Sequence, residues 1–277
     1  MTSLADLVNG LCGVYLDDSK AYLVEHRLSE VARRAQCPTL GDLVRRASMP
    51  GEMSLRNELI DAITTHETLF FRDQSPFEAL QFKVLPELFD AQSNSAFGPR
   101  LRVWSAACST GQETYSLAMC IMETLGDATG WDIQILGTDV SAGAVAQAMR
   151  GEYAVLDVER GLSAQRRERW FEPIPNGWRV GPELRRLCRF EQRNLLASFP
   201  ERDTFHVVMC RNVAIYFERD VRREMFQRMI GTMAPTGYLF VGASENLADC
   251  GPEFKAEMHC RSVFYRPRLV NNPISLQ

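Results

Sequence analysis

Three groups of polar side chains follow apolar runs of the sequence, at places where strands could end. Small residues and one glycine, Gly111, follow the first run and lead to Glu113. Asp139 ends the second run, and Arg211 and Asn212 follow the third. In an open α/β sheet, ligands bind beyond the carboxyl ends of the strands. We therefore expect these side chains to line one ligand site.

The residue types in the first group separate two kinds of ligand. A dinucleotide site uses the pattern GxGxxG, whose glycines and following helix N-terminus hold a pyrophosphate. This turn has one glycine, and Glu113 would repel a phosphate. S-adenosylmethionine carries a ribose, an amino group and a sulfonium but no phosphate, so the negative charge of Glu113 would suit it. Asp139 could accept hydrogen bonds from both ribose hydroxyls. The alternative is that Glu113 is only a helix-start acid favoured by the helix dipole.

Strands that alternate with helices are predicted to position these residues. From residue 99 onward, strands are expected at 101–106, 133–138, 205–211, 238–242 and 262–266, and helices at 115–125, 142–150 and 221–233. Alternation of this kind predicts an α/β fold, in which helices cover both faces of a doubly wound, mostly parallel sheet.

Two other parts of the chain follow different patterns. Residues 1–75 have apolar residues at helical spacing and predict a small N-terminal all-helical domain. Residues 76–98 are expected to form a linker helix and loop, and residues 99–277 the ligand-binding domain. Within that domain, residues 156–193 contain a polar helix, prolines and short strand-like runs, one of them at 188–191. This segment predicts an inserted β subdomain.

The composition is that of a globular protein without a general attraction to polyanions. Hydrophobic residues make up 45% of the 277 residues, and the formal net charge of −4 argues against nucleic-acid or acidic-lipid partners. No apolar run approaches the roughly 20 residues that span a bilayer, and no secretory signal pattern is visible. None of the eight cysteines forms a CxxC pair, and His259-Cys260 has no second pair at ligand spacing. We expect a cytoplasmic monomer that binds no metal and does not insert into membranes.

Four motifs, in order and with plausible gaps, carry a resemblance to a known family. They are Thr65 to Asp73 (THETLFFRD), Trp104 to Ser116 (WSAACSTGQETYS), Cys210 to Phe217 (CRNVAIYF) and Gly242 to Asn246 (GASEN). Together they resemble the chemotaxis receptor methyltransferases (CheR-type), over about residues 15–265. The resemblance implies a class I methyltransferase-like, Rossmann-like fold. It also implies methyl transfer from S-adenosylmethionine to glutamates of bacterial chemoreceptors, which gives glutamate methyl esters and S-adenosylhomocysteine and serves sensory adaptation.

The resemblance also implies, position by position, which residues surround the cofactor. They are His66, Thr68, Arg72, Glu113, Asp139, Asn194, Leu195, Arg211 and Asn212. His66 stands where the family usually has an asparagine, and an imidazole can still form a hydrogen bond there although it is bulkier and titratable.

The proposed reaction needs orientation rather than a general base. A glutamate side chain has a pKa of about 4.3, so it is already a nucleophile at neutral pH. Arg72 could orient the incoming carboxylate with its planar guanidinium, and Tyr216 could place its hydroxyl beside the same group. The alternatives are a structural salt bridge for Arg72 and a core aromatic for Tyr216.

Partner recognition is predicted to involve positive charge on the N-terminal domain. The resemblance points to Arg27 and Arg33 as contacts for the cytoplasmic helical region of chemoreceptors, and a plain solvated face is the alternative. The loop 171–178 is short, so tethering of a receptor's C-terminal peptide is not expected. Two other functions remain open: a catalytically weak signalling adaptor that binds S-adenosylmethionine or S-adenosylhomocysteine and a receptor, and a nicotinamide oxidoreductase, which the missing glycine pattern disfavours.

Overall fold

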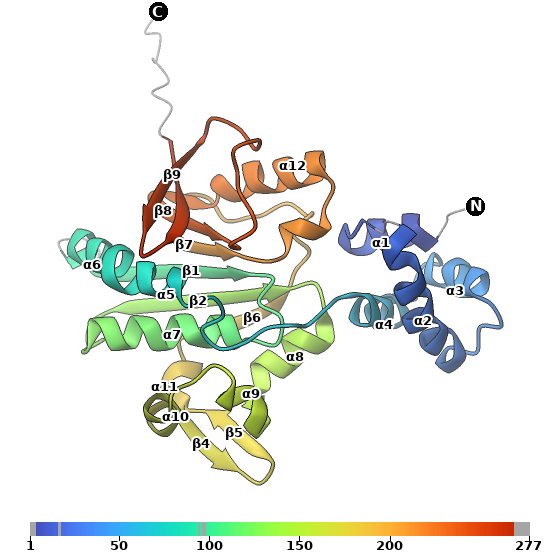
Figure 1. Cartoon of the computed structure of the whole chain (residues 1–277), viewed down its shortest axis with the longest axis horizontal. Coiled ribbons are helices and arrows are strands. Elements are labelled where there is room, and N and C mark those ends of the chain that lie inside the picture. The colour runs from blue at the N-terminus through green and yellow to red at the C-terminus, as the bar shows by residue number, and fades with distance from the viewer. Residues whose placement is uncertain (1–3, 16–17, 94, 96–97, 269–277) are drawn as a thin grey trace, which may run out of the picture.

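The computed structural model of the chain describes residues 4–15, 18–93, 95 and 98–268, which form two lobes (Figure 1). The smaller lobe, here called the helical bundle, contains α1 (Leu4–Cys12), α2 (Asp18–Arg34), α3 (Leu40–Ala47) and α4 (Met53–Ile63). Its apolar faces meet in a separate core, in which Val8, Leu28, Leu43 and Leu59 are almost completely buried. The helical character predicted for this part of the chain is therefore confirmed.

The larger lobe, here called the sheet domain, is built on a seven-stranded sheet with the order β6-β2-β1-β7-β8-β10-β9. Its strands are β1 (Arg100–Ala106), β2 (Asp132–Asp139), β6 (Cys188–Gln192), β7 (Phe205–Cys210), β8 (Met233–Val241), β9 (Phe254–His259) and β10 (Ser262–Pro267). The five strands from β6 to β8 are parallel, whereas β10 and β9 are antiparallel additions at one edge. The predicted mostly parallel sheet is confirmed, and β9 is a strand that the sequence patterns missed.

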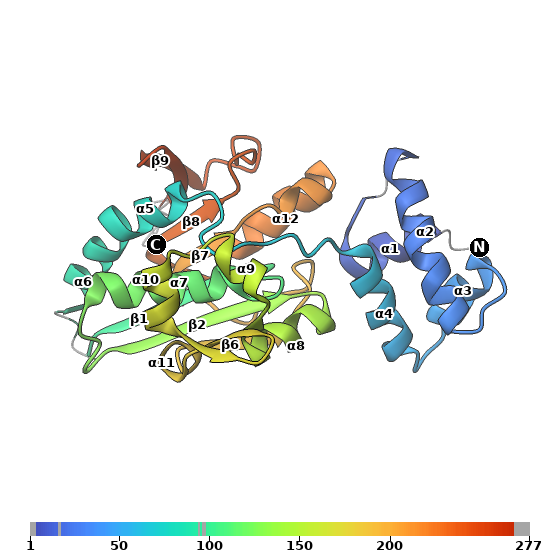
Figure 2. The same cartoon turned by 60° about the horizontal axis from the view of Figure 1, so that its bottom comes forward.

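Helices cover both faces of this sheet (Figure 2). On one face, the core includes side chains of α5 (Ser75–Ala79), the π-helical turn η1 (Leu80–Val84), α6 (Leu85–Ser93) and α7 (Gln112–Leu125). On the other face, the core includes side chains of α12 (Arg219–Ile230). Neighbouring residues of β1 divide between the two cores, since Val103 lies in the first and Trp104 in the second. A strand buried on both faces has this pattern. α8 (Ala142–Arg150) follows β2.

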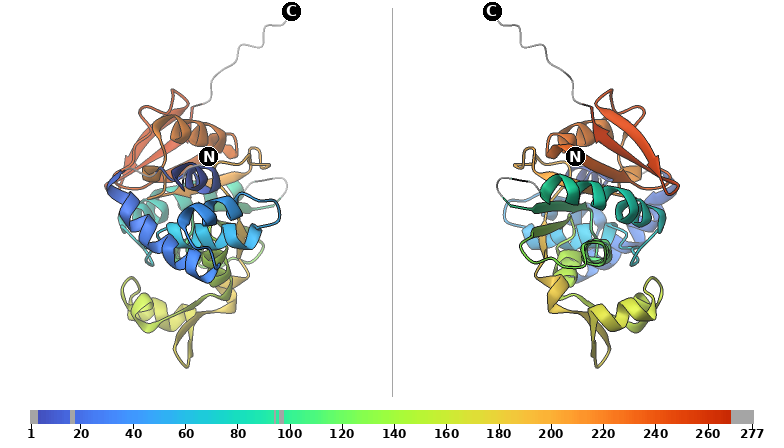
Figure 3. Two further views of the ribbon diagram at one scale, coloured as in Figure 1. Left: turned by 90° about the vertical axis from the view of Figure 1, so that its right-hand side faces the viewer. Right: turned by 90° about the vertical axis from the view of Figure 1, so that its left-hand side faces the viewer.

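A second, three-stranded sheet with the order β3-β5-β4 projects from the main body (Figure 3). It contains β3 (Glu152–Tyr153), β4 (Phe171–Ile174) and β5 (Gly177–Val180), accompanied by α9 (Val155–Glu159), α10 (Ala164–Trp170) and α11 (Pro182–Arg185). The run 188–191 was predicted to belong to this subdomain, and that assignment is wrong. The run forms β6, which pairs in parallel with β2 at the edge of the main sheet. β3 also begins before residue 156, where the subdomain was expected to start.

Within the described ranges, no helix combines the length and apolar character that crossing a bilayer requires.

Candidate functional site

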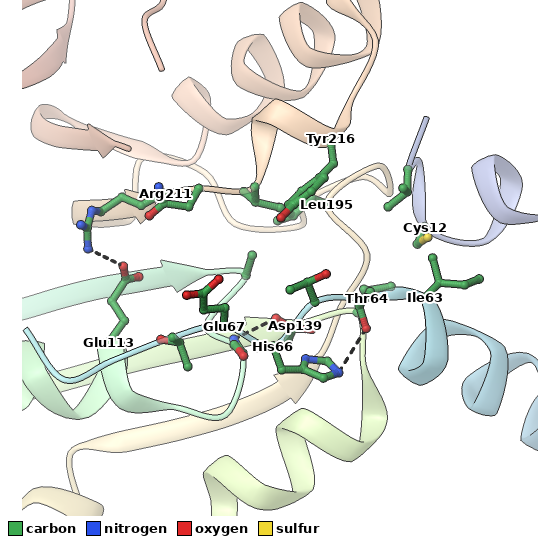
Figure 4. A pocket seen from close by; sticks show the side chains of 18 of the residues that line it. Cys12, Ile63, Thr64, His66, Glu67, Glu113, Asp139, Leu195, Arg211 and Tyr216 are labelled. Atoms are coloured by element: carbon green, nitrogen blue, oxygen red, sulfur yellow. Dashed lines mark hydrogen bonds and ion pairs between the residues drawn. The ribbon is translucent and has the colours of Figure 1, made fainter. Parts of the chain in front are cut away.

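A cavity opens beyond the carboxyl ends of β1, β2 and β7, and the helical bundle closes one side of it (Figure 4). The nine residues that the resemblance places around the cofactor all line this cavity: His66, Thr68, Arg72, Glu113, Asp139, Asn194, Leu195, Arg211 and Asn212. Tyr216 lines it as well. Residues that are far apart in the sequence therefore share one concave site at the edge of the sheet where α/β proteins bind ligands.

The turn after β1 brings the backbone close to the cavity. Ala107, Ser109 and Gly111 all have positive φ angles, and that of Gly111 is 97°. A Cβ atom on Gly111 would lie 2.8 Å from the Cβ of Ala148 and 3.0 Å from the hydroxyl of Tyr153. Glycine is required there for both the conformation and the space, as close helix–strand packing demands.

Asp139 is held by the backbone on both sides. Its Oδ2 accepts a hydrogen bond from the amide of Ser109 at 2.8 Å, and its Oδ1 accepts one from the amide of Ser141 at 2.9 Å. Burial raises the pKa of this carboxyl group, while those two amides and the nearby His66 lower it. Each oxygen keeps a second lone pair, so the carboxylate can still accept two hydroxyl groups from the cavity side.

Glu113 and Arg211 form an ion pair at the opposite end of the cavity. One oxygen of Glu113 accepts a hydrogen bond from the Ser105 hydroxyl at 2.8 Å, and the other lies 3.1 Å from Arg211 Nη1. Arg211 also donates to the carbonyl of Arg72 and to the carboxylate of Asp73. Its side chain is 1% exposed. The guanidinium is therefore engaged by the protein and points away from the cavity centre (Figure 4), and it ties β7 to α7 and to the segment before α5.

The segment between α4 and α5 carries Arg72 into the cavity. Its anchors are Phe70 and Phe71, both buried, and the Phe71 amide donates to the hydroxyl of Ser116 at 2.9 Å. Arg72 Nη1 donates to the carbonyl of Glu67 at 2.7 Å. Among the described residues, no carboxylate lies within ion-pair distance of Arg72, so the structural salt bridge considered above is absent there. Its other donors remain available to a ligand.

His66 and Asn194 occupy the wall formed with the helical bundle. The His66 Nε2 atom lies 3.2 Å from the Thr64 hydroxyl, and the ring lines the cavity. Asn194 donates through Nδ2 to the carbonyl of Leu11 in α1 at 3.0 Å and accepts from the amide of Leu196. The cavity is consequently lined by both lobes.

Glu245 is a site residue to which the sequence analysis gave no role. Its carboxylate accepts hydrogen bonds from the amides of Asn212, Ala214 and Gly242, at 2.8, 2.9 and 2.6 Å. These bonds fix the turn between β7 and the short helix η2 (Ala214–Tyr216), and with it the places of Asn212 and Tyr216. The signal was present in the GASEN motif, but spacing alone gave no indication that this acid binds backbone amides.

The two arginines predicted to contact a receptor lie in different environments. Arg33 lies outside the cavity, with its side chain 74% exposed and paired with Glu30 at 2.7 Å. Arg27 is half-buried, lines the cavity and reaches the carbonyl of Ile63 at 3.5 Å. The bundle also contributes Cys12, Val14 and Ile63 to the lining. The resemblance placed His66, Thr68 and Arg72, at the end of the predicted N-terminal domain, around the cofactor, but no sequence pattern indicated that residues before 64 would line the cavity.

Within the part of the chain that is described, no three His, Cys, Asp or Glu side chains are grouped so that they could hold a metal ion.

Comparison with known proteins matches both lobes to family models. Residues 66–263 match the family described as CheR methyltransferase, SAM binding domain, and residues 1–64 match CheR methyltransferase, all-alpha domain. Chemotaxis protein methyltransferase 1 of Pseudomonas aeruginosa is 42% identical over 262 residues, which cover 93% of each chain. Chemotaxis protein methyltransferase Cher2 of Pseudomonas putida is 43% identical over 261 residues, which cover 93% of this chain and 94% of the relative.

More distant matches follow. The chemotaxis protein methyltransferase of Vibrio parahaemolyticus is 38% identical over 258 residues, which cover 92% of each chain. Among solved structures, the DhpI-SAH complex aligns with a TM-score of 0.38 at 14% identity, over 89% of this chain and 80% of that one. The two family models and the three chemotaxis relatives confirm the resemblance seen in the four motifs over nearly the whole chain.

Proposed function

The chain belongs to the CheR methyltransferase family and is a methyltransferase that uses S-adenosylmethionine, and we propose that it methylates glutamate side chains of bacterial chemoreceptors. The product would be a glutamate methyl ester. A carboxylate oxygen would bond to the methyl carbon in line with the breaking carbon–sulfur bond, and S-adenosylhomocysteine would leave. The observation that supports an acidic acceptor most directly is Arg72, which lines the cavity and has no carboxylate partner among the described residues.

The residues of the cavity divide the work of binding the cofactor. Asp139 accepts the ribose hydroxyls through the lone pairs that the backbone amides leave free. Glu113 is only partly neutralised by Arg211, so it can still attract the amino group of the methionine part. Asn194, Leu195 and Asn212, which also line the cavity, would enclose the rest of the cofactor. When bound, S-adenosylmethionine supplies a methyl group on a positively charged sulfur.

The remaining residues position the acceptor. The guanidinium of Arg72 can hold one carboxylate oxygen of the incoming glutamate and leave the other free to attack. The hydroxyl of Tyr216, at the same cavity, can restrict the carboxylate on its other side. Alignment of two bound reactants can contribute on the order of 7–11 kcal/mol to lowering a barrier. A glutamate that is already ionised therefore requires no general base from the protein.

We propose that the acceptor is presented by the cytoplasmic helical region of a chemoreceptor and that the enzyme acts in the cytoplasm. Arg33 and Arg34 lie exposed on α2 and could contact an acidic helix face, although Glu30 partly neutralises both. β4 and β5 are joined by a connection of only Pro175 and Asn176, which offers little surface to a receptor's C-terminal peptide. No feature of the cavity favours a non-catalytic adaptor.

Transfer of tritiated methyl groups to membranes that contain the host's receptors tests this function. A glutamate methyl ester releases labelled methanol when the product is treated with mild base, whereas methyl groups on nitrogen stay on the protein. We expect label on the receptor and its release by base. Label that survives base would contradict ester formation, and the absence of transfer to every receptor would contradict the choice of acceptor.

A further inference from the structure

Contacts between the two lobes converge on the cavity. Four hydrogen bonds that cross from the helical bundle to the sheet domain end on a cavity residue or within two positions of one. They are Asn194 Nδ2 to the Leu11 carbonyl (3.0 Å), the Tyr15 amide to the Tyr216 carbonyl (2.9 Å), Gln192 Nε2 to Asn57 Oδ1 (3.0 Å), and the Ser141 hydroxyl to Asp61 Oδ1 (2.6 Å). The placement of the bundle is therefore linked to the geometry of the ligand site.

The contact at Asp61 reaches the ribose side of the cavity in two steps. Asp61, on α4, accepts a hydrogen bond from the Ser141 hydroxyl, and the amide of the same serine donates to Asp139 Oδ1 at 2.9 Å. The Ser141 hydroxyl also accepts from the amide of Ala144 and so caps α8. One serine thus connects an acid of the helical bundle to the carboxylate of Asp139.

The surroundings of Asp61 restrict how it can move. Its Oδ1 also lies 3.4 Å from the amide of Gly143, and a Cβ atom on Gly143 would come within 2.8 Å of Oδ2. Gly143 is in the first turn of α8, where the exposed amides of a helix favour a negative charge. Because α8 accommodates this carboxylate closely, a shift of α4 would be transmitted to Ser141.

We propose that Asp61 is a positioning residue for the cofactor, which acts through Ser141 to hold Asp139 in the orientation that binds the ribose hydroxyls. The proposal rests on the ribose role given to Asp139 under the proposed function. It makes cofactor affinity depend on how the helical bundle docks, although Asp61 itself does not line the cavity.

Calorimetric titration of the full-length protein with two ligands tests the proposal. The ligands are S-adenosylhomocysteine and its 2′,3′-dideoxy analogue, which lacks the groups that Asp139 is proposed to bind. Asp61→Ala removes the acceptor, and Asp61→Asn keeps an oxygen for the Ser141 hydroxyl. Glu58→Ala removes an exposed acid of the same helix that pairs with Arg34. Thermal melting of each variant monitors folding.

We expect Asp61→Ala to lower the affinity for S-adenosylhomocysteine by about 10-fold, the equivalent of about one hydrogen bond. The affinity for the dideoxy analogue should fall by less than about 2-fold. Asp61→Asn and Glu58→Ala should stay within about 3-fold of the wild type for both ligands. A merely structural loss would instead weaken both ligands by the same factor, and that result would overturn the proposal. If the wild type itself bound both ligands equally, the ribose role of Asp139 would fail and the role of Asp61 with it, whereas methyl transfer would still be judged by the receptor assay.

Discussion

Three arginines at the cavity or on α2 differ in what their guanidinium groups contact. Arg211 is buried and bound to two carboxylates and a carbonyl, so its removal would leave the Glu113 carboxylate with the Ser105 hydroxyl but without a positive charge beside it. Arg33 is exposed and paired with Glu30 on the same helix, an interaction that contributes little to stability. Arg72 has one bond to its own segment and free donors directed at a cavity. Of these three, only Arg72 has a guanidinium that is held by the protein and yet has no carboxylate partner among the described residues.

Replacement of Arg72 is therefore expected to separate binding from transfer. In Arg72→Ala, the dissociation constant for S-adenosylhomocysteine should rise by less than about 10-fold, because the other cofactor residues remain. The kcat for methyl transfer should fall by about 100-fold or more, since a correctly placed charge at the reacting group is lost. Arg72→Lys should recover only part of the rate, because an ammonium on a flexible stem orients the carboxylate less firmly than a rigid guanidinium. Unchanged turnover in Arg72→Ala would refute the orienting role.

At the residue scale, the sequence indicated which side chains share the site but not which hydrogen bonds and ion pairs they form with the rest of the protein. The ends of the strands predicted that Glu113 and Asp139 share a site, because parallel strands end at one edge. The direction of Arg211 could not be predicted, since it depends on the position of Asp73 in a segment 138 residues earlier. Contacts of this kind are set by tertiary packing and leave no periodic signal.

At the scale of elements, the turn after β7 depends on one carboxylate. Glu245 accepts from three backbone amides, and two of them belong to the turn that carries Asn212 and ends at Tyr216. A glutamine has one acceptor oxygen, and its amino group would face amides that also donate. The carboxylate therefore holds the backbone of this turn in place after the end of β7.

Glu245→Gln is expected to destabilise the protein by about 2 kcal/mol, because at least one buried amide loses its acceptor. Affinity for S-adenosylhomocysteine should also fall, since Asn212 lines the cavity. Urea unfolding and calorimetry measure the two effects. Glu253→Gln, a change outside the cavity on the segment before β9, serves as a comparison. Equal binding by Glu245→Gln and the wild type would show that the turn keeps its shape without the carboxylate.

The elements differ in how well the sequence revealed them. Strands that are largely buried, such as β1 and β7, consist mostly of apolar residues and were predicted. β9 was missed although the segment FKAEMH alternates apolar and polar residues as a half-buried strand does, and at this sheet edge its apolar Met258 is exposed. β6 was assigned to the wrong sheet, since its short run carries no information about which partner it will pair with. Partner choice is a property of the assembled fold.

The start of β7 carries a buried histidine with a consequence at acid pH. His206 is 6% exposed, and its Nδ1 accepts from the amide of Arg102 at 3.0 Å. Burial, together with the nearby charges of Arg100 and Arg102, lowers the pKa of His206 to about 4. Between about pH 6.5 and pH 4, this histidine is therefore protonated in the unfolded chain, where its pKa is near 6.5, but neutral in the folded chain. Stability is lost as the pH falls from about 6.5 towards about 4.

His206→Asn should remove this part of the acid sensitivity, because an asparagine oxygen can accept from the Arg102 amide but does not titrate. The difference in free energy of unfolding between wild type and variant should shrink from pH 7.5 to pH 4, by at most about 3 kcal/mol. Urea unfolding at several pH values measures it. The carboxylates that titrate in the same range are common to both chains, so a constant difference would contradict a buried neutral histidine.

At the scale of the whole molecule, the cofactor site exists only where the two lobes meet. Cys12, Val14, Arg27 and Ile63 come from the helical bundle, and they close a cavity whose floor is the edge of the sheet (Figure 4). The bundle has its own core, so it can move against the sheet domain without unfolding. Ligand affinity then depends on the docked arrangement, and mutations at the junction are expected to act on binding more than on folding.

Gly13 lies at the junction of the two lobes and has no room for a side chain. Its φ is +74°, and a Cβ atom there would lie 2.4 Å from Leu196 Cδ1 and 3.1 Å from a ring carbon of Phe217. Both neighbours belong to the sheet domain and adjoin the cavity residues Leu195 and Tyr216. Gly13→Ala would place an alanine in the left-handed backbone conformation, which costs about 1 kcal/mol. The added methyl group would also push α1 away from these side chains.

We expect Gly13→Ala to lower the affinity for S-adenosylhomocysteine by about 10-fold or more. The rate of amide hydrogen exchange should also rise in residues 64–74, which connect the lobes. The matched control is Gly10→Ala, three residues earlier within α1, where nothing lies within 4 Å of the added carbon. That change should leave binding unaltered and stabilise the helix by about 0.5–1 kcal/mol, because alanine loses less backbone entropy than glycine. If both variants bound the ligand equally well, the junction at Gly13 would not control closure, since the two substitutions differ only in what the new methyl group meets and in the backbone angle it must adopt.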